Sequence, residues 1–183
     1  MDRVFVFVAT FGHIGKLPKA PGTWASAATA LIIFGAARLF HLPGLAVAPL
    51  PWLAFFALLL VLGVISAGAT EKILDRPDPG CVVIDEVLGQ AIAMSLIPDD
   101  PFWAFFAFVL FRMLDILKPF PVGWLDRHLH GGLGIMLDDV AAGFFALAFF
   151  AIHTNISEMK IRNITTFLFY LYVGVCSRRQ GRS

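Results

Sequence analysis

The chain has 183 residues, enough for about one domain, yet 58% of them are hydrophobic and only 15% are charged. Soluble domains carry roughly 25% charged residues, and a core of this size could not enclose 19 phenylalanines together with so much Leu, Ala, Val and Ile. The composition therefore excludes an ordinary soluble domain and predicts a protein embedded in a membrane. A formal net charge of +1 argues against nucleic-acid binding, which favours strongly basic domains.

Acidic residues are concentrated in the middle of the chain. Eleven of the 13 acids lie between Glu71 and Asp139, together with only five of the 14 Lys and Arg residues. Both ends of the chain are basic, which suits the anionic cytoplasmic face of a membrane. Cys81 and Cys176 show neither metal-site nor disulfide spacing and are predicted to be apolar fillers.

Two segments in the first half of the chain are predicted to cross a membrane. The shorter apolar run Val4–Phe11 has no cleavage site before Lys16, so we do not expect a cleaved signal peptide. Thr23–Leu39 is a candidate span that carries Arg38 near its end, where the long side chain can reach the interface. Leu50–Thr70 has no charged residue and reaches the length of about 20 residues that a span needs.

Three further apolar segments carry ionisable groups near one end, so the apolar part of each can enter the membrane while the polar end meets water. They are Cys81–Ile97, Phe102–Leu117 and Ile135–Ile152, and breaker-rich stretches join them at Arg76–Gly80 and Lys118–Gly134. Ile164–Cys176 is too short for a span and is predicted to be interfacial or an extra helix. The predicted fold class is all-α, a polytopic membrane helical bundle with a polar site at its cytoplasmic face.

Two adjacent carboxylates, Asp85 and Glu86, lie near the start of one of these apolar segments. Such charges are costly unless a cation or a proton compensates them, although the dipole at a helix start favours acids. Gly89 lies four residues after Asp85 and leaves room on the same helix face for another helix or a ligand. A simple N-terminal cap pair is the alternative to a ligand site.

A glycine-rich stretch, Gly131–Gly134, precedes a second acidic pair, Asp138 and Asp139. If these glycines form a turn that opens a helix, the backbone N–H groups of Gly132 and Gly134 suit phosphate oxygens. The two carboxylates follow within about the first turn, where they can hold Mg²⁺, a cation that takes oxygen ligands and often keeps water molecules. The pattern therefore predicts phosphate and metal binding at one place.

Arg112, Asp115 and Lys118 recur every three residues before Pro119, so we expect them along one side of a helix that the proline ends. Arg112 can bind phosphate through two hydrogen bonds, and Lys118 can act as a point charge. Asp115 can ligate a metal or orient Arg112. The alternative is a ladder of ion pairs within one helix.

Asp126 and His130 are four residues apart, so the carboxylate can fix the imidazole tautomer for proton transfer to a leaving oxygen. A polar anchor at the interface is the alternative for this histidine. The stretch at residues 12–26, rich in proline and glycine and containing Thr23, leads into a helix start and is a second candidate anion site. No cysteine or serine has a base beside it in sequence, which disfavours covalent nucleophilic catalysis.

Four segments of the chain are PKAPGTW at residues 18–24, IDEVLG at 84–89, FRMLDILKPFP at 111–121 and HGGLGIMLDDVAAG at 130–143. In this order they resemble the phosphatidylglycerophosphatase A family of bacteria. The resemblance implies an all-helical, Mg²⁺-dependent lipid phosphatase of the inner membrane, multi-pass and with its site facing the cytoplasm. It also implies that phosphatidylglycerophosphate is hydrolysed to phosphatidylglycerol and inorganic phosphate, so the expected partners are a phospholipid substrate and the membrane.

The resemblance and the residue patterns together give a predicted site in which activated water attacks phosphorus in line. The predicted Mg²⁺ ligands are Asp85, Glu86, Asp138 and Asp139, and the catalytic set adds Asp115 and His130. The predicted substrate-binding residues are Thr23, Arg112, Lys118, Arg127, Gly132 and Gly134.

The catalytic membrane domain is predicted to cover residues 1–153, and residues 154–183 to be a variable tail or an extra helix. An ion-coupled membrane transporter would also explain acids in apolar segments, but it typically shows internal repeats and helix breaks in mid-membrane. An enzyme like the CDP-alcohol phosphotransferases would combine acids, Mg²⁺ and a lipid, but its longer spaced acidic pattern is absent. Both stand as alternatives to the phosphatase.

Overall fold

The computed structural model describes residues 2–96 and 100–152, and every element within these ranges is a helix. Residues up to Ala148 form one compact unit, and Phe149 begins a second. The elements in chain order are α1 (Asp2–Ala9), the short 3-10 helix η1 (Ile14–Lys16), α2 (Pro21–Phe40), α3 (Pro49–Leu74), α4 (Ile84–Met94), α5 (Pro101–Leu117), α6 (Val122–His128) and the last helix, Gly131–Ile152. This confirms the all-helical prediction; the segment Ile164–Cys176 and the tail 154–183 lie outside the described residues.

Within the described residues, three helices are long and apolar enough to cross a membrane, namely α2, α3 and the last helix. In α3 the apolar side chains of Leu58, Val61 and Ile65 are exposed at the molecular surface. A large apolar surface on a folded helix is stable where lipid, not water, covers it. The two spans predicted in the first half of the chain correspond to α2 and α3, and α3 extends four residues further, to Leu74.

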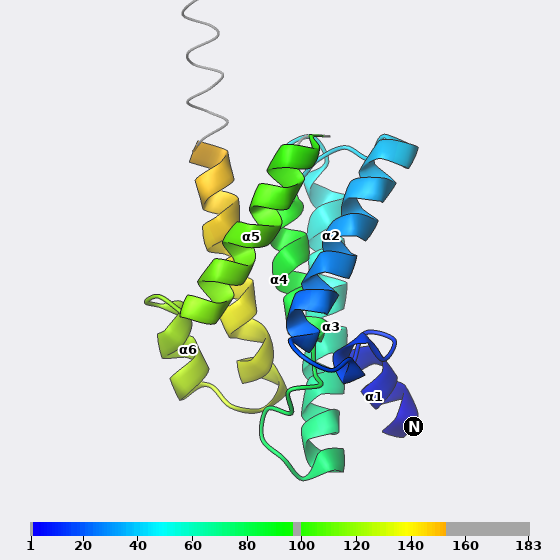
Figure 1. The fold of residues 1–183 in the computed structure, drawn as a ribbon, viewed down its shortest axis with the longest axis vertical. Coiled ribbons are helices and arrows are strands. Elements are labelled where there is room, and N and C mark those ends of the chain that lie inside the picture. The colour runs from blue at the N-terminus through cyan, green and yellow to red at the C-terminus, as the bar shows by residue number, and fades with distance from the viewer. Residues whose placement is uncertain (1, 97–99, 153–183) are drawn as a thin grey trace, which may run out of the picture. The chain divides into compact units, whose positions relative to one another are not determined.

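The helix α4 is shorter than the apolar pattern predicted. It runs for 11 residues, too few to cross a membrane, and nine of them are buried. It contacts α2, α3 and α5, and Figure 1 shows it in the middle of the bundle. Apolar residues such as Val82 and Val83 precede the helix and are buried as well, which is why hydrophobicity alone overestimated its length.

The helices alternate in direction, so that α2, α4 and the last helix begin at the same end of the bundle at which α3 and α5 finish (Figure 1). The short helix α6 lies in the segment that was predicted to be a connection between apolar segments. The last helix begins at Gly131, four residues earlier than predicted. This end of the bundle therefore gathers the helix termini and loops that carry most of the charged residues in the described part of the chain.

Candidate active site

A cavity of about 410 Å³ opens at this end of the bundle. Among the described residues it is lined by eight carboxylates, by two side chains with a permanent positive charge and by one histidine. The acids are Glu71, Asp78, Asp85, Glu86, Asp115, Asp126, Asp138 and Asp139, and the others are Arg112, Lys118 and His130. Carboxylates gathered at this density repel one another, so the cavity is suited to cations.

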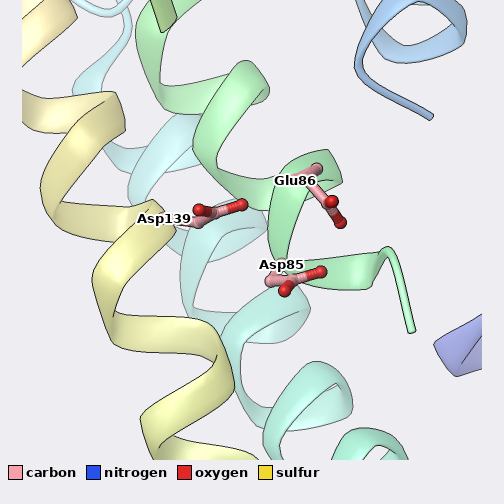
Figure 2. A group of neighbouring side chains, drawn as sticks. All are labelled: Asp85, Glu86 and Asp139. Atoms are coloured by element: carbon pink, nitrogen blue, oxygen red, sulfur yellow. The ribbon is translucent and has the colours of Figure 1, made fainter. Parts of the chain in front are cut away.

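Three of the carboxylates converge on one point. Asp85 and Glu86 come from the first turn of α4 and Asp139 from the last helix, as Figure 2 shows. One oxygen atom from each of the three lies within 4.8 Å of the other two. The structure thus brings together an acidic triad (Asp85, Glu86 and Asp139) from segments more than 50 residues apart in the sequence.

Two glycines allow this approach. A Cβ atom built on Gly143 would lie 2.5 Å from the backbone oxygen of Gly89, and one built on Gly89 would lie 2.7 Å from the backbone oxygen of Asp139. Real Cβ atoms do not come so close to backbone oxygens, so α4 and the last helix can touch here only because both side chains are missing. Asp85 and Asp139 lie one turn before this contact, and their side chains meet in the cavity.

The triad fits a divalent cation with oxygen ligands. The atoms Oδ1 of Asp85, Oε2 of Glu86 and Oδ2 of Asp139 are buried and have no hydrogen-bond partner among the described residues. Burial and the adjacent negative charge of Glu86 raise the pKa of Asp85 well above its ordinary value. Unpartnered buried carboxylate oxygens are costly, and Mg²⁺ or a similar hard cation is the kind of ligand that satisfies them.

Arg112 lies beside the triad. Its Nη1 atom is 2.5 Å from Oδ2 of Asp115 and 3.9 Å from Oε1 of Glu86, and it is 3.5 Å from the hydroxyl oxygen of Ser26. The pair between Arg112 and Asp115 is within α5, as the ladder alternative predicted. Gly22 of α2 completes this wall, because a Cβ atom there would lie 1.9 Å from Oε1 of Glu86.

Lys118 forms a second charged group with carboxylates from two other elements. Its Nζ atom is 2.5 Å from Oδ1 of Asp126 on α6 and 2.7 Å from Oδ2 of Asp138 on the last helix. Partial burial alone would lower the pKa of this ammonium, but the two hydrogen bonds outweigh it and raise the pKa above its ordinary value. Lys118 therefore stays charged throughout the neutral range.

The structure separates the two members of the second acidic pair. Asp139 belongs to the triad, whereas Asp138 contacts Lys118. The prediction that both acids follow a glycine turn within one helical turn was wrong, because the helix already begins at Gly131 and the acids lie about two turns inside it. Whether Asp138 shares in metal binding stays a prediction.

The glycines before this pair are helical packing residues in the structure. A Cβ atom on Gly132 would lie 2.1 Å from the backbone oxygen of Val64 in α3, and one on Gly134 would lie 2.5 Å from the backbone oxygen of Leu129. Gly134 lines the cavity, but Gly132 does not. These glycines form the first turn of the last helix, and their phosphate binding stays a prediction.

His130 lines the cavity and is exposed. Its predicted helical pairing with Asp126 is not formed, because α6 ends at His128 and Asp126 is paired with Lys118. Among the described residues, neither Thr23 nor Arg127 lines the cavity; the Nε atom of Arg127 donates to the backbone oxygen of Gly123 at 2.7 Å. The roles predicted for these three side chains remain predictions.

Some lining residues were not predicted. Glu71, at the end of α3, accepts a hydrogen bond at Oε1 from the backbone N–H of Asp78 at 3.1 Å. Burial raises the pKa of Asp78 above its ordinary value. Both belong to the acidic middle of the chain, but they lie in or beside a loop, where charged residues are ordinary, so no sequence pattern distinguished them from other acids.

These features define a class of helical protein whose apolar helices are long enough to cross a membrane. At its polar end, an acidic triad of the kind that binds a metal lies beside cationic side chains that can bind a phosphate. The chain belongs to the phosphatidylglycerophosphatase A family, whose model matches residues 7–154. This match favours the lipid phosphatase over the transporter and phosphotransferase alternatives.

Curated relatives agree with this membership. The chain is 36% identical to the phosphatidylglycerophosphatase A of Haemophilus influenzae over 148 residues, covering 80% of this chain and 86% of the relative. It is 36% identical to that of Escherichia coli over 133 residues, covering 70% and 71%. A Bacteroides thetaiotaomicron protein provisionally named a phosphatidylinositol-3-phosphatase is 37% identical over 152 residues, covering 80% and 91%. No solved structure matches the chain significantly.

Proposed function

We propose that the cavity at the polar end of the bundle is where this chain dephosphorylates phosphatidylglycerophosphate, the activity that goes with its family. The reaction is a step of phospholipid synthesis. The observation that supports this place is the acidic triad lying in one cavity with Arg112 and Lys118. Acids for a cation and bases for a phosphate are the two requirements of metal-assisted phosphate hydrolysis.

Mg²⁺ is the proposed cofactor, and Asp85, Glu86 and Asp139 would hold it. The support is their mutual reach and their unpartnered buried oxygens. When bound, Mg²⁺ supplies Lewis-acid activation of water and neutralises charge on the phosphate. Without a cation the cavity would repel a dianionic phosphate, because its carboxylates outnumber its permanent cations.

The proposed task of Arg112 and Lys118 is to bind the oxygens of the terminal phosphate. Asp115 holds the guanidinium of Arg112 in place, and Asp138 holds the ammonium of Lys118. In the hydrolysis, the oxygen of a water molecule forms a bond to phosphorus, and the bond from phosphorus to the glycerol oxygen breaks. The attacking water loses one proton and the glycerol oxygen takes one up. His130 or a carboxylate is the group proposed to transfer the proton, because both kinds of side chain line the cavity.

The proposed location is the bacterial inner membrane, with the cavity facing the cytoplasm. Arg3, Lys16 and Lys19 lie in the segment that leads into α2 at the end where the cavity opens. An excess of Lys and Arg outside the spans is typical of the cytoplasmic side.

Phosphate release in mixed micelles tests the function. The purified chain should release phosphate from phosphatidylglycerophosphate in the presence of Mg²⁺ and lose this activity when EDTA is added. Phosphatidylinositol 3-phosphate should be included because of the Bacteroides relative, and soluble glycerol 3-phosphate should be included as a substrate without acyl chains. Faster release from either of these than from phosphatidylglycerophosphate would contradict the proposed substrate, and full activity in EDTA would contradict the cofactor.

A further inference from the structure

Lys118 is held by two carboxylates that differ in their surroundings. Asp138 lies on the last helix and its side chain is only 9% exposed, whereas the side chain of Asp126 on α6 is 38% exposed. The Nζ atom of Lys118 donates a charge-assisted hydrogen bond to each of the two carboxylates. The ammonium is therefore already neutralised before any ligand enters the cavity.

A phosphate that binds to Lys118 has to take the place of one of these two carboxylates. Asp138 is the costly one to release, because it is buried and its other oxygen, Oδ1, already lacks a hydrogen-bond partner in the part of the chain that the structure describes. Asp126 is the easy one, since its carboxylate is more exposed and can turn into water, and an exposed ion pair contributes little to stability. The ligand should therefore replace Asp126.

The position of Asp126 is built into the fold. A Cβ atom on Gly123 would lie 2.5 Å from the backbone oxygen of Lys118, so α6 packs directly on the end of α5. The backbone N–H of Gly123 also donates to the oxygen of Pro119 at 3.3 Å. This packing sets Asp126, three residues further on in α6, against the ammonium of Lys118.

We infer that Asp126 is a positioning residue for Lys118: its carboxylate occupies the phosphate position on the ammonium, and a phosphate group has to displace it. The cost of this displacement is the same for every ligand that binds to Lys118. Asp126 thus weakens the binding of the substrate phosphate and of the released inorganic phosphate alike, and it takes its place on Lys118 again when phosphate leaves. The inference rests on the proposed function, because it takes Lys118 to be a phosphate ligand.

The variant Asp126→Asn tests the inference, with the inhibition constant for inorganic phosphate as the readout. The amide keeps the size of the side chain and removes its charge, so phosphate should bind more tightly. We expect about a two- to fivefold fall in the inhibition constant, the range for an exposed ion pair. The fall should be lost when Lys118 is also changed to Gln, because Asp126 acts through this ammonium.

The matched control is Asp75→Asn. Asp75 is exposed at the end of α3, does not line the cavity and has a positive φ that asparagine tolerates. Its inhibition constant for phosphate should stay at the wild-type value. If Asp126→Asn leaves the constant unchanged, or if the control lowers it to the same extent, the inference is overturned. Asp126→Ala serves as the second variant if the first lowers the melting temperature.

A further variant separates this inference from the proposed function. Lys118→Gln should weaken inhibition by phosphate if Lys118 binds the ligand. An unchanged constant in Lys118→Gln would mean that the proposed role of Lys118 fails, and the inference with it. Weaker inhibition in Lys118→Gln combined with no effect of Asp126→Asn would overturn only the role of Asp126.

Discussion

Asp138 and Asp139 are neighbours in the chain but have different partners. Consecutive residues of an α-helix point about 100° apart, so one side chain faces Lys118 and the other faces Asp85 and Glu86. A metal ligand and a positioning residue for a cation can therefore occupy adjacent positions. Variants of the two should have different effects.

We expect Asp139→Asn to abolish metal binding and turnover, and Asp138→Asn to remove most turnover while metal binding persists. Loss of a direct ligand should cost more than the roughly 10- to 100-fold in affinity seen for outer partners of a metal. Mn²⁺ binding followed by EPR measures the first effect independently of activity. Wild-type turnover in Asp138→Asn, or wild-type Mn²⁺ affinity in Asp139→Asn, would contradict these assignments.

At the level of elements, the long apolar helices could be predicted from the sequence, because their hydrophobic residues alone indicate a helix in a membrane. α3 follows from a long run without charge. In contrast, α6 has only seven residues, follows Pro121 and contains Gly123, so its sequence has the composition of a connection. Its helix depends on packing against the end of α5, which no local pattern reveals.

The site residues were predictable where carboxylates interrupt an apolar segment of the sequence, as Asp85, Glu86 and Asp139 do. The partners of Lys118 were not predictable. Spacing of three residues placed Lys118 on the same helical row as Arg112 and Asp115, but α5 ends at Leu117 and Lys118 adopts a left-handed conformation with φ of 44°. The side chain thus leaves the row, and its contacts depend on two elements that come later in the chain.

The contact between α4 and the last helix predicts how a substitution at Gly143 changes stability and metal binding. Gly143→Ala should lower both the melting temperature and the affinity for Mn²⁺, because its Cβ atom would meet the backbone of Gly89 and push the helices apart. Overpacking typically costs about 1–3 kcal/mol, against about 1 kcal/mol gained when alanine replaces glycine in a helix.

Gly35→Ala is the matched control for this change. Gly35 lies within α2, and no atom is within 4 Å of the position of its Cβ. The control should keep its Mn²⁺ affinity and melt at the same or a slightly higher temperature. Equal behaviour of the two variants in both measurements would show that the contact does not set the distance between the carboxylates.

For the whole molecule, the side of the membrane that the cavity faces can be tested at Cys81. This residue lies in the loop that leads into α4, between Gly80 and Val82, which both line the cavity. Its side chain is partly exposed. In a Cys176→Ser background, a membrane-impermeant maleimide should therefore leave Cys81 unlabelled in intact spheroplasts and label it after permeabilisation, if the cavity faces the cytoplasm. Labelling of intact spheroplasts would place the cavity on the other side.

Asp85 and Gly89 are separated by four residues, and so are Asp139 and Gly143. The pitch of the helix sets the distance from each acid to the glycine four residues later. The contact between the two backbones sets the distance between the helices. The distance between the carboxylates thus depends on the same acid-to-glycine spacing in two separate segments of the sequence. This pair of spacings should be recognisable even in relatives whose other residues differ widely. Introduced into another pair of parallel helices, it should bring two carboxylates equally close.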